Sequence, residues 1–543
     1  MRKIIFITAT LLAASSVGVH AQENESLIRR IEVTRQYVPE VEGARKIDYA
    51  PRMGDTVTLK PYIDYAITPT PWKSVFGTEP IEPINISTAR YEPINPFYLR
   101  AGAGYPLTST ANLRTSFGNP SDRHFGIYAD HDGQWQHLID DTAPAGCTEN
   151  RLGFNGGFAA GQRMFDYDLH YDLNARQWNG TNNTSFNYFN NISAAVRFGD
   201  SFADLSRFNY RVGLTGGFWG NSLQSIKHNG GLDAFADFAW PLGSGAILTD
   251  AGFNGDWNPD ISDQLFSLAP HYRLSVSDLN LNVGAKLYFN NYNFYSNRGN
   301  NIYVVPDVKI SYTVLPTFEP YLSIDGSVAN SSYKDLYAIN PYVVPLSAGM
   351  RPKTLSLQGG VRGNARDILV YDIYAGYMAA DTFCFVRSME TGAFSPIQVP
   401  LNVTFASANL GIHLPTGFGF LAGVHYNSYN NDPNLWRGTS TPTQLGMGIP
   451  TLNLSGTISY DYRNKLFTKV RADFIGKRFM ASAQDFYTEV PSYVDLSASV
   501  EYKFSNRFSV FLQGNNLLNK PIYHYLGYKE YGVRGVVGFI VVF

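Results

Sequence analysis

Two segments of the sequence combine aromatic rings with amide side chains, a chemistry suited to sugars or peptides. Tyr292 and Tyr295 stand among four asparagines between residues 290 and 298, and Tyr429 and Trp436 stand among four more between residues 426 and 436. A few polar groups placed beside aromatic faces can orient a ligand. Asparagine-rich segments are also ordinary loop tips. Ligand contact at these four aromatic residues and an ordinary loop role therefore stay open as alternatives.

Catalytic and metal-binding motifs are absent from the sequence. It contains neither a Gly-x-Ser-x-Gly elbow nor a His-Glu-x-x-His pair, and its ten histidines are scattered. The acidic run from Asp256 to Asp263 lacks the glycine and the final glutamate of an EF-hand loop. We therefore expect no enzyme, no catalytic residue, no bound metal and no cofactor. A hydrolase using His131 with Asp132 is the alternative that the sequence leaves open.

The composition excludes several further classes of protein. Lys and Arg number 43 against 45 Asp and Glu, so a net charge of -2 offers no basic field for nucleic acid. Charged residues make up 16% and aromatic residues 15% of the chain, a balance opposite to that of disordered proteins. The two cysteines, Cys147 and Cys384, are too few for a disulfide scaffold, and we favour free thiols over one bridge between loops.

The N-terminal residues predict export. Arg2 and Lys3 precede an apolar stretch from Ile4 to Val19, and a small-residue cleavage site ends at Ala21. These features are typical of a secretory signal peptide spanning residues 1–21. No later run of 18 apolar residues predicts a transmembrane helix.

Residues 22–95 form a proline-rich leader that differs from the rest of the chain. A proline recurs about every seven to twelve residues over much of it, which opposes helices and confines strands to edges. Apolar residues such as Trp72 and Phe76 are too frequent for a free linker. We therefore expect an extended periplasmic or lumenal segment that lies against a surface, and no globular domain.

From residue 96 to 543 the chain alternates between apolar and polar residues. In residues 165–176 the odd positions are apolar or aromatic and the even positions are polar, and residues 493–504 repeat such a pattern. Period two indicates strands with unlike faces. Segments of ten to fourteen residues exceed the usual five or six of soluble sandwiches. The pattern predicts an all-β fold, a transmembrane antiparallel β-barrel whose outer surface contacts outer-membrane lipid.

Turn lengths give the barrel its orientation. Tight turns alternate with longer connections, which include residues 290–301, 380–401 and 430–450. Short turns face the periplasm and long loops face outward in bacterial barrels. Counting the segments gives about 22 strands, with both chain ends on the short-turn side. The hairpin near Tyr105 is the weakest part of this count because its loop is short for the outer side.

The polar face of the predicted strands carries charge of both signs. Such side chains are too costly to place in lipid, so they are expected to line a hydrated lumen. These residues are Asp166, Asp168, Asp172, Lys309, Lys469, Arg471 and Lys503.

The last ninety residues resemble the end of a TonB-dependent receptor barrel. The strand at Tyr493 leads to Gly514-Asn515-Asn516-Leu517-Leu518-Asn519-Lys520, similar to the family's Asn-Leu-Phe-Asp-Lys motif. The element from Tyr531 to Gly535 then precedes a strand that ends on Phe543. The resemblance covers the barrel, whereas the family's globular plug exceeds the length of the leader. The leader itself is similar to that of plug-less, receptor-like barrels of Bacteroidota.

The resemblance implies a function and several partners. It suggests passage or binding of an unidentified solute, and the alternative is a structural barrel that docks other envelope proteins. It implies that Phe543 is recognised by the barrel-assembly machinery.

Ile31, Val33 and Thr34 could form a TonB-box-like strand, although any alternating tetrapeptide fits equally well. TonB and an envelope lipoprotein are thus alternative partners, and the leader and inward-folded loops such as 380–401 are expected to close the lumen.

Overall fold

A computed structural model describes most of the region predicted to form the barrel. The described residues are 96–119, 122–137, 145–177, 186–222, 229–258, 261–294, 297–328, 333–344, 352–390, 393–429, 448–482 and 488–543. The predicted signal peptide and leader, including the TonB-box-like residues, lie outside the described residues.

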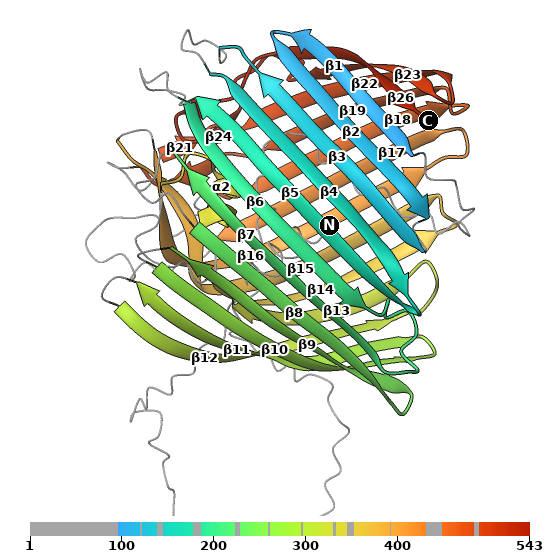
Figure 1. Cartoon of the computed structure of the whole chain (residues 1–543), viewed down its shortest axis with the longest axis vertical. Helices are drawn as coiled ribbons and strands as arrows, with labels where there is room; N and C mark the ends of the chain where they lie inside the picture. The colour runs from blue at the N-terminus through green and yellow to red at the C-terminus, as the bar shows by residue number, and fades with distance from the viewer. Residues whose placement is uncertain are drawn as a thin grey trace, which may run out of the picture.

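The chain forms one closed antiparallel sheet of 22 strands (Figure 1). Each strand pairs with the next along the chain, and the last strand pairs with the first. This result confirms the predicted fold class and strand count, including the short first hairpin. The strands of the wall are β1 (Phe97–Tyr105), β2 (Thr108–Asn119), β3 (Arg123–Gln134), β4 (Cys147–Ala160), β5 (Arg163–Gln177), β6 (Phe186–Gly199), β7 (Asn209–Asn221), β8 (Asn229–Leu242), β9 (Gly245–Trp257), β10 (Ile261–Val276), β11 (Leu279–Phe294), β12 (Asn297–Tyr312), β13 (Glu319–Val328), β14 (Lys353–Ala365), β15 (Leu369–Ser388), β16 (Phe394–His413), β17 (Phe418–Tyr429), β18 (Leu452–Tyr462), β19 (Leu466–Ile475), β22 (Tyr493–Ser505), β23 (Phe508–Asn515) and β26 (Arg534–Val542).

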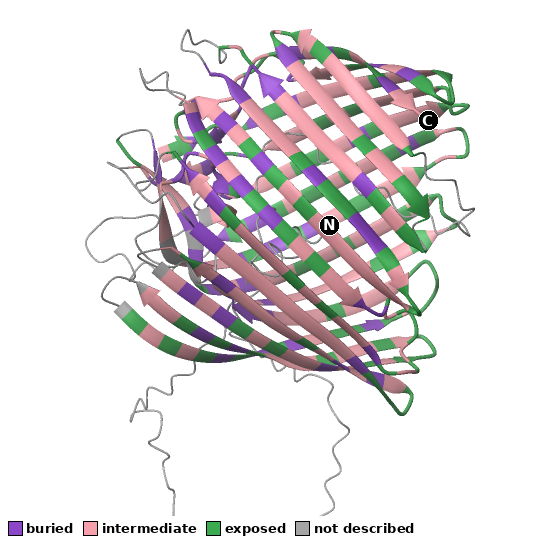
Figure 2. Ribbon diagram, in the orientation of Figure 1, coloured by how far each residue is buried: buried purple, intermediate pink, exposed green. Residues whose placement is uncertain are grey.

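Alternating side chains give the wall two unlike faces (Figure 2). In β5, Leu169 and Tyr171 are each 43% exposed on the apolar face, whereas Asp172 is 6% exposed on the polar face. Closure of the sheet places one face toward the interior and the other toward the surroundings, and lipid requires the apolar face outward. Backbone groups of the wall are paired between strands, as a hydrocarbon environment demands.

The two ends of the barrel differ in their connections. At the short-turn rim, neighbouring strands such as β4 and β5 are joined by two residues, and the start of β1 and the end of β26 lie there. At the opposite, long-loop rim, the connections contain further short elements. These elements are α2 (Tyr333–Ile339), β20 (Arg478–Met480), β21 (Thr488–Val490), β24 (Tyr523–Tyr525) and β25 (Tyr528–Lys529).

Helices contribute little to the described part of the chain. Nowhere in it is a helix long and apolar enough to cross a membrane.

Two connections predicted as long loops are strands instead. Between residues 290 and 301, β11 and β12 stay paired as far as Phe294 and Asn297, with Asn290 opposite Asn301. Between residues 380 and 401, β15 and β16 continue past a register shift at Ala380 to pair Ser388 with Phe394. The predictions were wrong because strand pairing continues beyond the lipid-facing band, where backbone hydrogen bonds need no alternation of side-chain polarity.

The seam between the first and last strands is covered from inside by Phe511. Its ring packs over Gly102 of β1 and Gly538 of β26, and a Cβ on Gly102 would lie 2.9 Å from Phe511 Cζ. The Arg100 guanidinium lies 4.1 Å above the same ring, a cation–π arrangement. Glycine is therefore required where the ring crosses the closure seam.

Replacing Leu169 with Arg should impair barrel assembly. The guanidinium would stand on the lipid-facing side of β5, at a cost of roughly 2–4 kcal/mol near the midplane. Asp168→Asn, on the polar face, should assemble normally. Heat-modifiable migration of the membrane fraction measures both, and equal tolerance at the two positions would contradict the assigned faces.

Replacing Gly102 with Ala should lower the temperature at which the barrel loses its folded migration. The new methyl group would be forced against Phe511 and Val536 at the seam. Gly535→Ala on β26 is the matched control, because a Cβ there would meet nothing within 4 Å. Equal shifts in the two variants would show that the seam imposes no such requirement.

Candidate functional site

The polar face of β1 to β6 carries a ladder of complementary groups. Arg100, Asn112, Asp130, Arg151, Asp172 and Asn191 are successive cross-strand partners. Arg151 Nε lies 2.5 Å from Asp172 Oδ1, and Asn191 donates to the other oxygen of Asp172 at 2.8 Å. Charged side chains on neighbouring strands thus neutralise one another. This part of the wall is therefore strongly polar without a large excess of either charge.

The residues predicted to line the lumen lie on this polar face. Asp166 pairs with Arg197, and Asp168 accepts a 2.7 Å hydrogen bond from the Tyr128 hydroxyl. Across the barrel the remaining predicted residues occupy equivalent positions. Lys309 lies 3.7 Å from Asp307, Arg471 lies 2.6 Å from Asp473, Lys469 is opposite Ser499, and Lys503 lies 4.4 Å above the Phe467 ring.

Apolar residues from six connections and strand ends gather in one cluster at the long-loop rim. We call the cluster the lid. Its buried members are Phe189, Trp219, Leu336, Tyr337, Tyr342, Val343, Ala393, Phe394, Met480, Val490, Tyr525 and Tyr528. In Figure 1 the labels of α2, β21 and β24 lie together at the left end of the barrel.

The lid spans the mouth of the barrel. Phe189 belongs to β6 and Phe394 to β16, and these strands are ten apart in one direction and twelve in the other around the 22-stranded wall. The Tyr337 ring of α2 stacks on Phe189 at 4.1 Å, and Tyr342 stacks on Tyr528 at 4.2 Å. Strands on opposite sides of the barrel are therefore joined through aromatic contacts of their connections.

Hydrogen bonds fix the middle of the lid. The Tyr525 hydroxyl donates to the Ile339 carbonyl at 2.6 Å, at the end of α2. Val343 and Phe394 form a parallel bridge, in which the Phe394 N–H donates to the Tyr342 carbonyl at 3.0 Å. The middle of the lid is thus formed by three separate connections, which contact one another through backbone as well as side-chain groups.

Of the predicted ligand-contact residues, Tyr292 and Tyr429 lie in the described part of the chain, on the separate strands β11 and β17. Tyr292 lies within β11 opposite Gly299 of β12. Tyr429 is buried at the end of β17, where its hydroxyl donates to the carbonyls of Ile449 and Pro450 at 3.1 Å. Tyr295 and Trp436 lie outside the described residues. The Tyr429 hydroxyl therefore fixes the backbone of the connection that leads into β18.

Sequence reasoning missed the aromatic residues of the lid. Tyr337, Tyr342, Tyr525 and Tyr528 lie in connections, where no strand pattern marks them. The signal in the sequence that could have revealed them is the density of tyrosines. Four of these, Tyr523, Tyr525, Tyr528 and Tyr531, fall within nine residues. Aromatic residues that recur in a connection between two barrel strands indicate a buried contact more strongly than an exposed tip.

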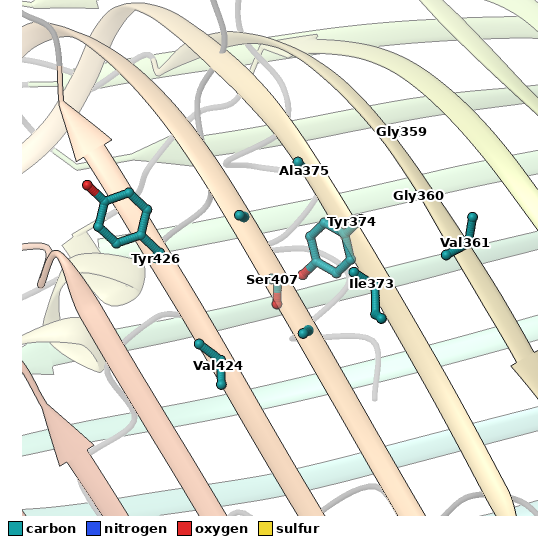
Figure 3. Close-up of a pocket in the computed structure, with 11 residues that line it drawn as sticks. Gly359, Gly360, Val361, Ile373, Tyr374, Ala375, Ser407, Val424 and Tyr426 are labelled. Carbon is teal, nitrogen blue, oxygen red and sulfur yellow. The ribbon is translucent and has the colours of Figure 1, made fainter.

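A shallow depression of about 510 Å³ lies in the wall at β14 to β17 (Figure 3). Small residues line much of it, and Ile373, Val424 and Tyr426 stand at its sides on the apolar face. Its polar side-chain groups are the hydroxyls of Tyr374, Ser407 and Tyr426, and it contains no charged residue.

Comparison with known proteins identifies the fold. No family model and no curated protein matches the sequence. Among solved structures, the siderophore receptor PirA from Acinetobacter baumannii matches with a TM-score of 0.61 at 12% identity, covering 82% of this chain and 80% of that one. The copper transporter OprC matches with a TM-score of 0.64 at 11% identity, covering 83% and 80%. A ferric enterobactin receptor from Pseudomonas aeruginosa matches with a TM-score of 0.63 at 11% identity, covering 82% and 81%.

The fold is that of a TonB-dependent receptor barrel. The predicted resemblance of the barrel fold is therefore confirmed. These neighbours are named as receptors and a transporter. The absence of a plug stays a prediction, since residues 1–95 lie outside the described part of this receptor-like barrel.

His524, on β24, is a titratable group buried beside the lid. Burial lowers the pKa of His524 from 6.5 to about 4, and Arg478, Arg534 and Arg176 add to that effect. The Glu530 carboxylate, 3.6 Å from His524 Nε2, acts in the opposite direction. The Tyr493 ring packs edge-on against the imidazole at 6.0 Å.

Acidification should therefore loosen the β24–β25 hairpin of the receptor-like barrel. An exposed imidazole takes up a proton near pH 6.5, whereas the buried one does so only near pH 4, so the closed state loses stability across that interval. The full shift is worth about 3–4 kcal/mol, or roughly three-hundredfold in the opening constant. Hydrogen-exchange protection of residues 523–529 should be constant above pH 7 and fall between pH 6.5 and 4. His524→Gln should remove this dependence, and an unchanged profile in that variant would assign the effect to another group.

Proposed function

We propose that this protein is a gated outer-membrane barrel for passage or binding of a solute, with the lid as its outer gate. The observation that carries the proposal is the lid, which joins β6 to β16 across the mouth. The fold shared with receptors and transporters supports the same function.

The size of the barrel explains why a closure is required. A barrel of 22 strands encloses a lumen too wide for wall side chains to fill, and barrels of this size are plugged. An open lumen would leak small molecules across the membrane.

The strength of the lid suits a gate. Each aromatic pair contributes on the order of 0.5–1.5 kcal/mol beyond burial. A few such contacts hold the lid closed and still allow a ligand or a partner to open it.

The orientation follows from the connections. We place the short-turn rim and both chain ends in the periplasm, and the lid at the outer surface. Phe543 is then the periplasmic end of β26, where it packs at 5.9 Å from Phe97 and is available to the barrel-assembly machinery.

The leader supplies the second closure in this proposal. Residues 22–95 would cap the short-turn mouth, because an extended proline-rich segment can find its hydrogen bonds on a polar wall. Ile31, Val33 and Thr34 would then be placed in the periplasm, where a TonB-like partner could pair with them by strand addition.

Removing the Tyr337 ring should open the outer gate. In planar bilayers, Tyr337→Ala should raise the conductance or the frequency of opening several-fold, since the stack on Phe189 is lost. Tyr426→Ala is the control, because that ring lies on the outer wall, 51% exposed. Unchanged conductance in Tyr337→Ala would remove the lid as a gate and favour the docking role.

The same measurement separates the two closures. A chain starting at Asn95 should conduct little while the lid is intact, and it should conduct most when combined with Tyr337→Ala. If removal of residues 22–94 changes nothing in either background, then the leader does not cap the barrel.

A further inference from the structure

A polar cavity lies against the inner wall of the barrel where the chain closes on itself. It has a volume of about 490 Å³ and is lined by side chains of β1 to β5, β23 and β26. Val536 is the one apolar residue among its lining, which contains no Phe, Tyr or Trp. Such a surface suits a solute that is small, strongly polar and without a flat apolar face.

Most charges of this lining are already matched by the protein. Asp130 accepts from Arg114 at 2.7 Å, and Asp172 accepts from Arg151 at 2.5 Å. Glu149 accepts from Arg176 at 2.9 Å. These three carboxylates are therefore neutralised before any solute arrives.

Asp132 and Arg534 are the exceptions. In the described part of the chain, neither forms a salt bridge, and both line the cavity. Arg534 is 7% exposed, and its Nε has no hydrogen-bond partner among the described residues. A buried guanidinium nitrogen without an acceptor is costly, so it marks a place for an anionic or carbonyl oxygen.

Gln134 holds these two opposite charges apart. Its Oε1 accepts from Arg534 Nη1, and its side chain also hydrogen-bonds the Asp132 carboxylate. An amide placed between a cation and an anion prevents their direct pairing and leaves each able to take an external partner. A second cation of the lining, Arg100, donates to an amide oxygen, Gln513 Oε1 at 3.1 Å, and forms no salt bridge with the described residues.

We propose that this cavity binds a zwitterionic solute, an amino acid or a short peptide, through Arg534 and Asp132. The solute carboxylate is bound by Arg534, with Arg100 as a further donor, and its ammonium group is bound by Asp132. Neighbouring amides such as Asn515 and Asn174 complete the hydrogen bonds of the solute. This inference rests on the proposed passage function and deepens it by naming a class of solute.

The lining argues against other classes of solute. A multiply charged anion would meet the Asp132 carboxylate, and a cation would meet the Arg534 and Arg100 guanidinium groups. A sugar binds through hydroxyl groups and gains nothing from a guanidinium and a carboxylate that each lack a charged partner. The opposite charges of Arg534 and Asp132 thus favour a ligand that carries both a negative and a positive group.

Calorimetric titration of the detergent-solubilised mature chain tests the proposal directly. The probes are alanyl-alanine, its N-acetylated and C-amidated form, and maltose. Alanyl-alanine should bind, whereas the capped peptide and maltose should bind at least tenfold more weakly. Asp132→Asn and Arg534→Gln should each weaken alanyl-alanine binding at least tenfold, and Lys469→Gln, elsewhere on the polar face, should leave it unchanged.

Two controls keep every outcome informative. Heat-modifiable migration verifies that each variant is folded, and if Arg534→Gln fails to fold, the near-isosteric Asp132→Asn decides. The titration is repeated in the Tyr337→Ala background so that a closed lid cannot block access. Absence of alanyl-alanine binding in both backgrounds, equal binding of the capped peptide, or unchanged binding in Asp132→Asn would overturn the proposal. Because the assay needs no membrane, its result is independent of the conductance measurements.

Discussion

The requirement that every backbone polar group be satisfied within hydrocarbon governs this structure. A sheet meets that requirement only when it has no edges, and the chain achieves it by pairing β26 with β1. Closure over 22 strands then creates a wide interior, and the interior in turn needs a polar wall and a cover. The ladder of charged and amide side chains and the aromatic lid both follow from that first constraint.

The sequence predicted the wall well because membrane strands obey two simple rules. Period-two alternation placed Leu169 and Asp172 on opposite faces, and the turn residues divided the chain into the correct number of strands. Alternation ceases to inform outside the lipid-facing band, where both faces of a hairpin meet water or protein. For that reason the extension of β15 and β16 beyond Ala380 was mistaken for a loop.

The lid and the polar cavity could not be predicted, because both depend on contacts between residues remote in sequence. Tyr337 meets Phe189 from 148 residues away, and Gln134 meets Arg534 across 400 residues. No local pattern encodes such pairs. The predicted aromatic and amide segments had a suitable composition for ligand contact, yet the structure buries Tyr429 against backbone carbonyls and places Tyr292 within a strand.

The unequal heights of the wall give the barrel a mechanical asymmetry. β15 and β16 contain 20 residues each, whereas β1 contains nine and joins β2 through Pro106 and Leu107 alone. The tall hairpin therefore projects beyond the low side of the rim by many strand residues, at about 3.3 Å for each. Phe394 is both the first residue of β16 and a member of the lid. A sideways displacement of the tip of the β15–β16 hairpin would therefore move Phe394 and strain the aromatic contacts that cross the mouth.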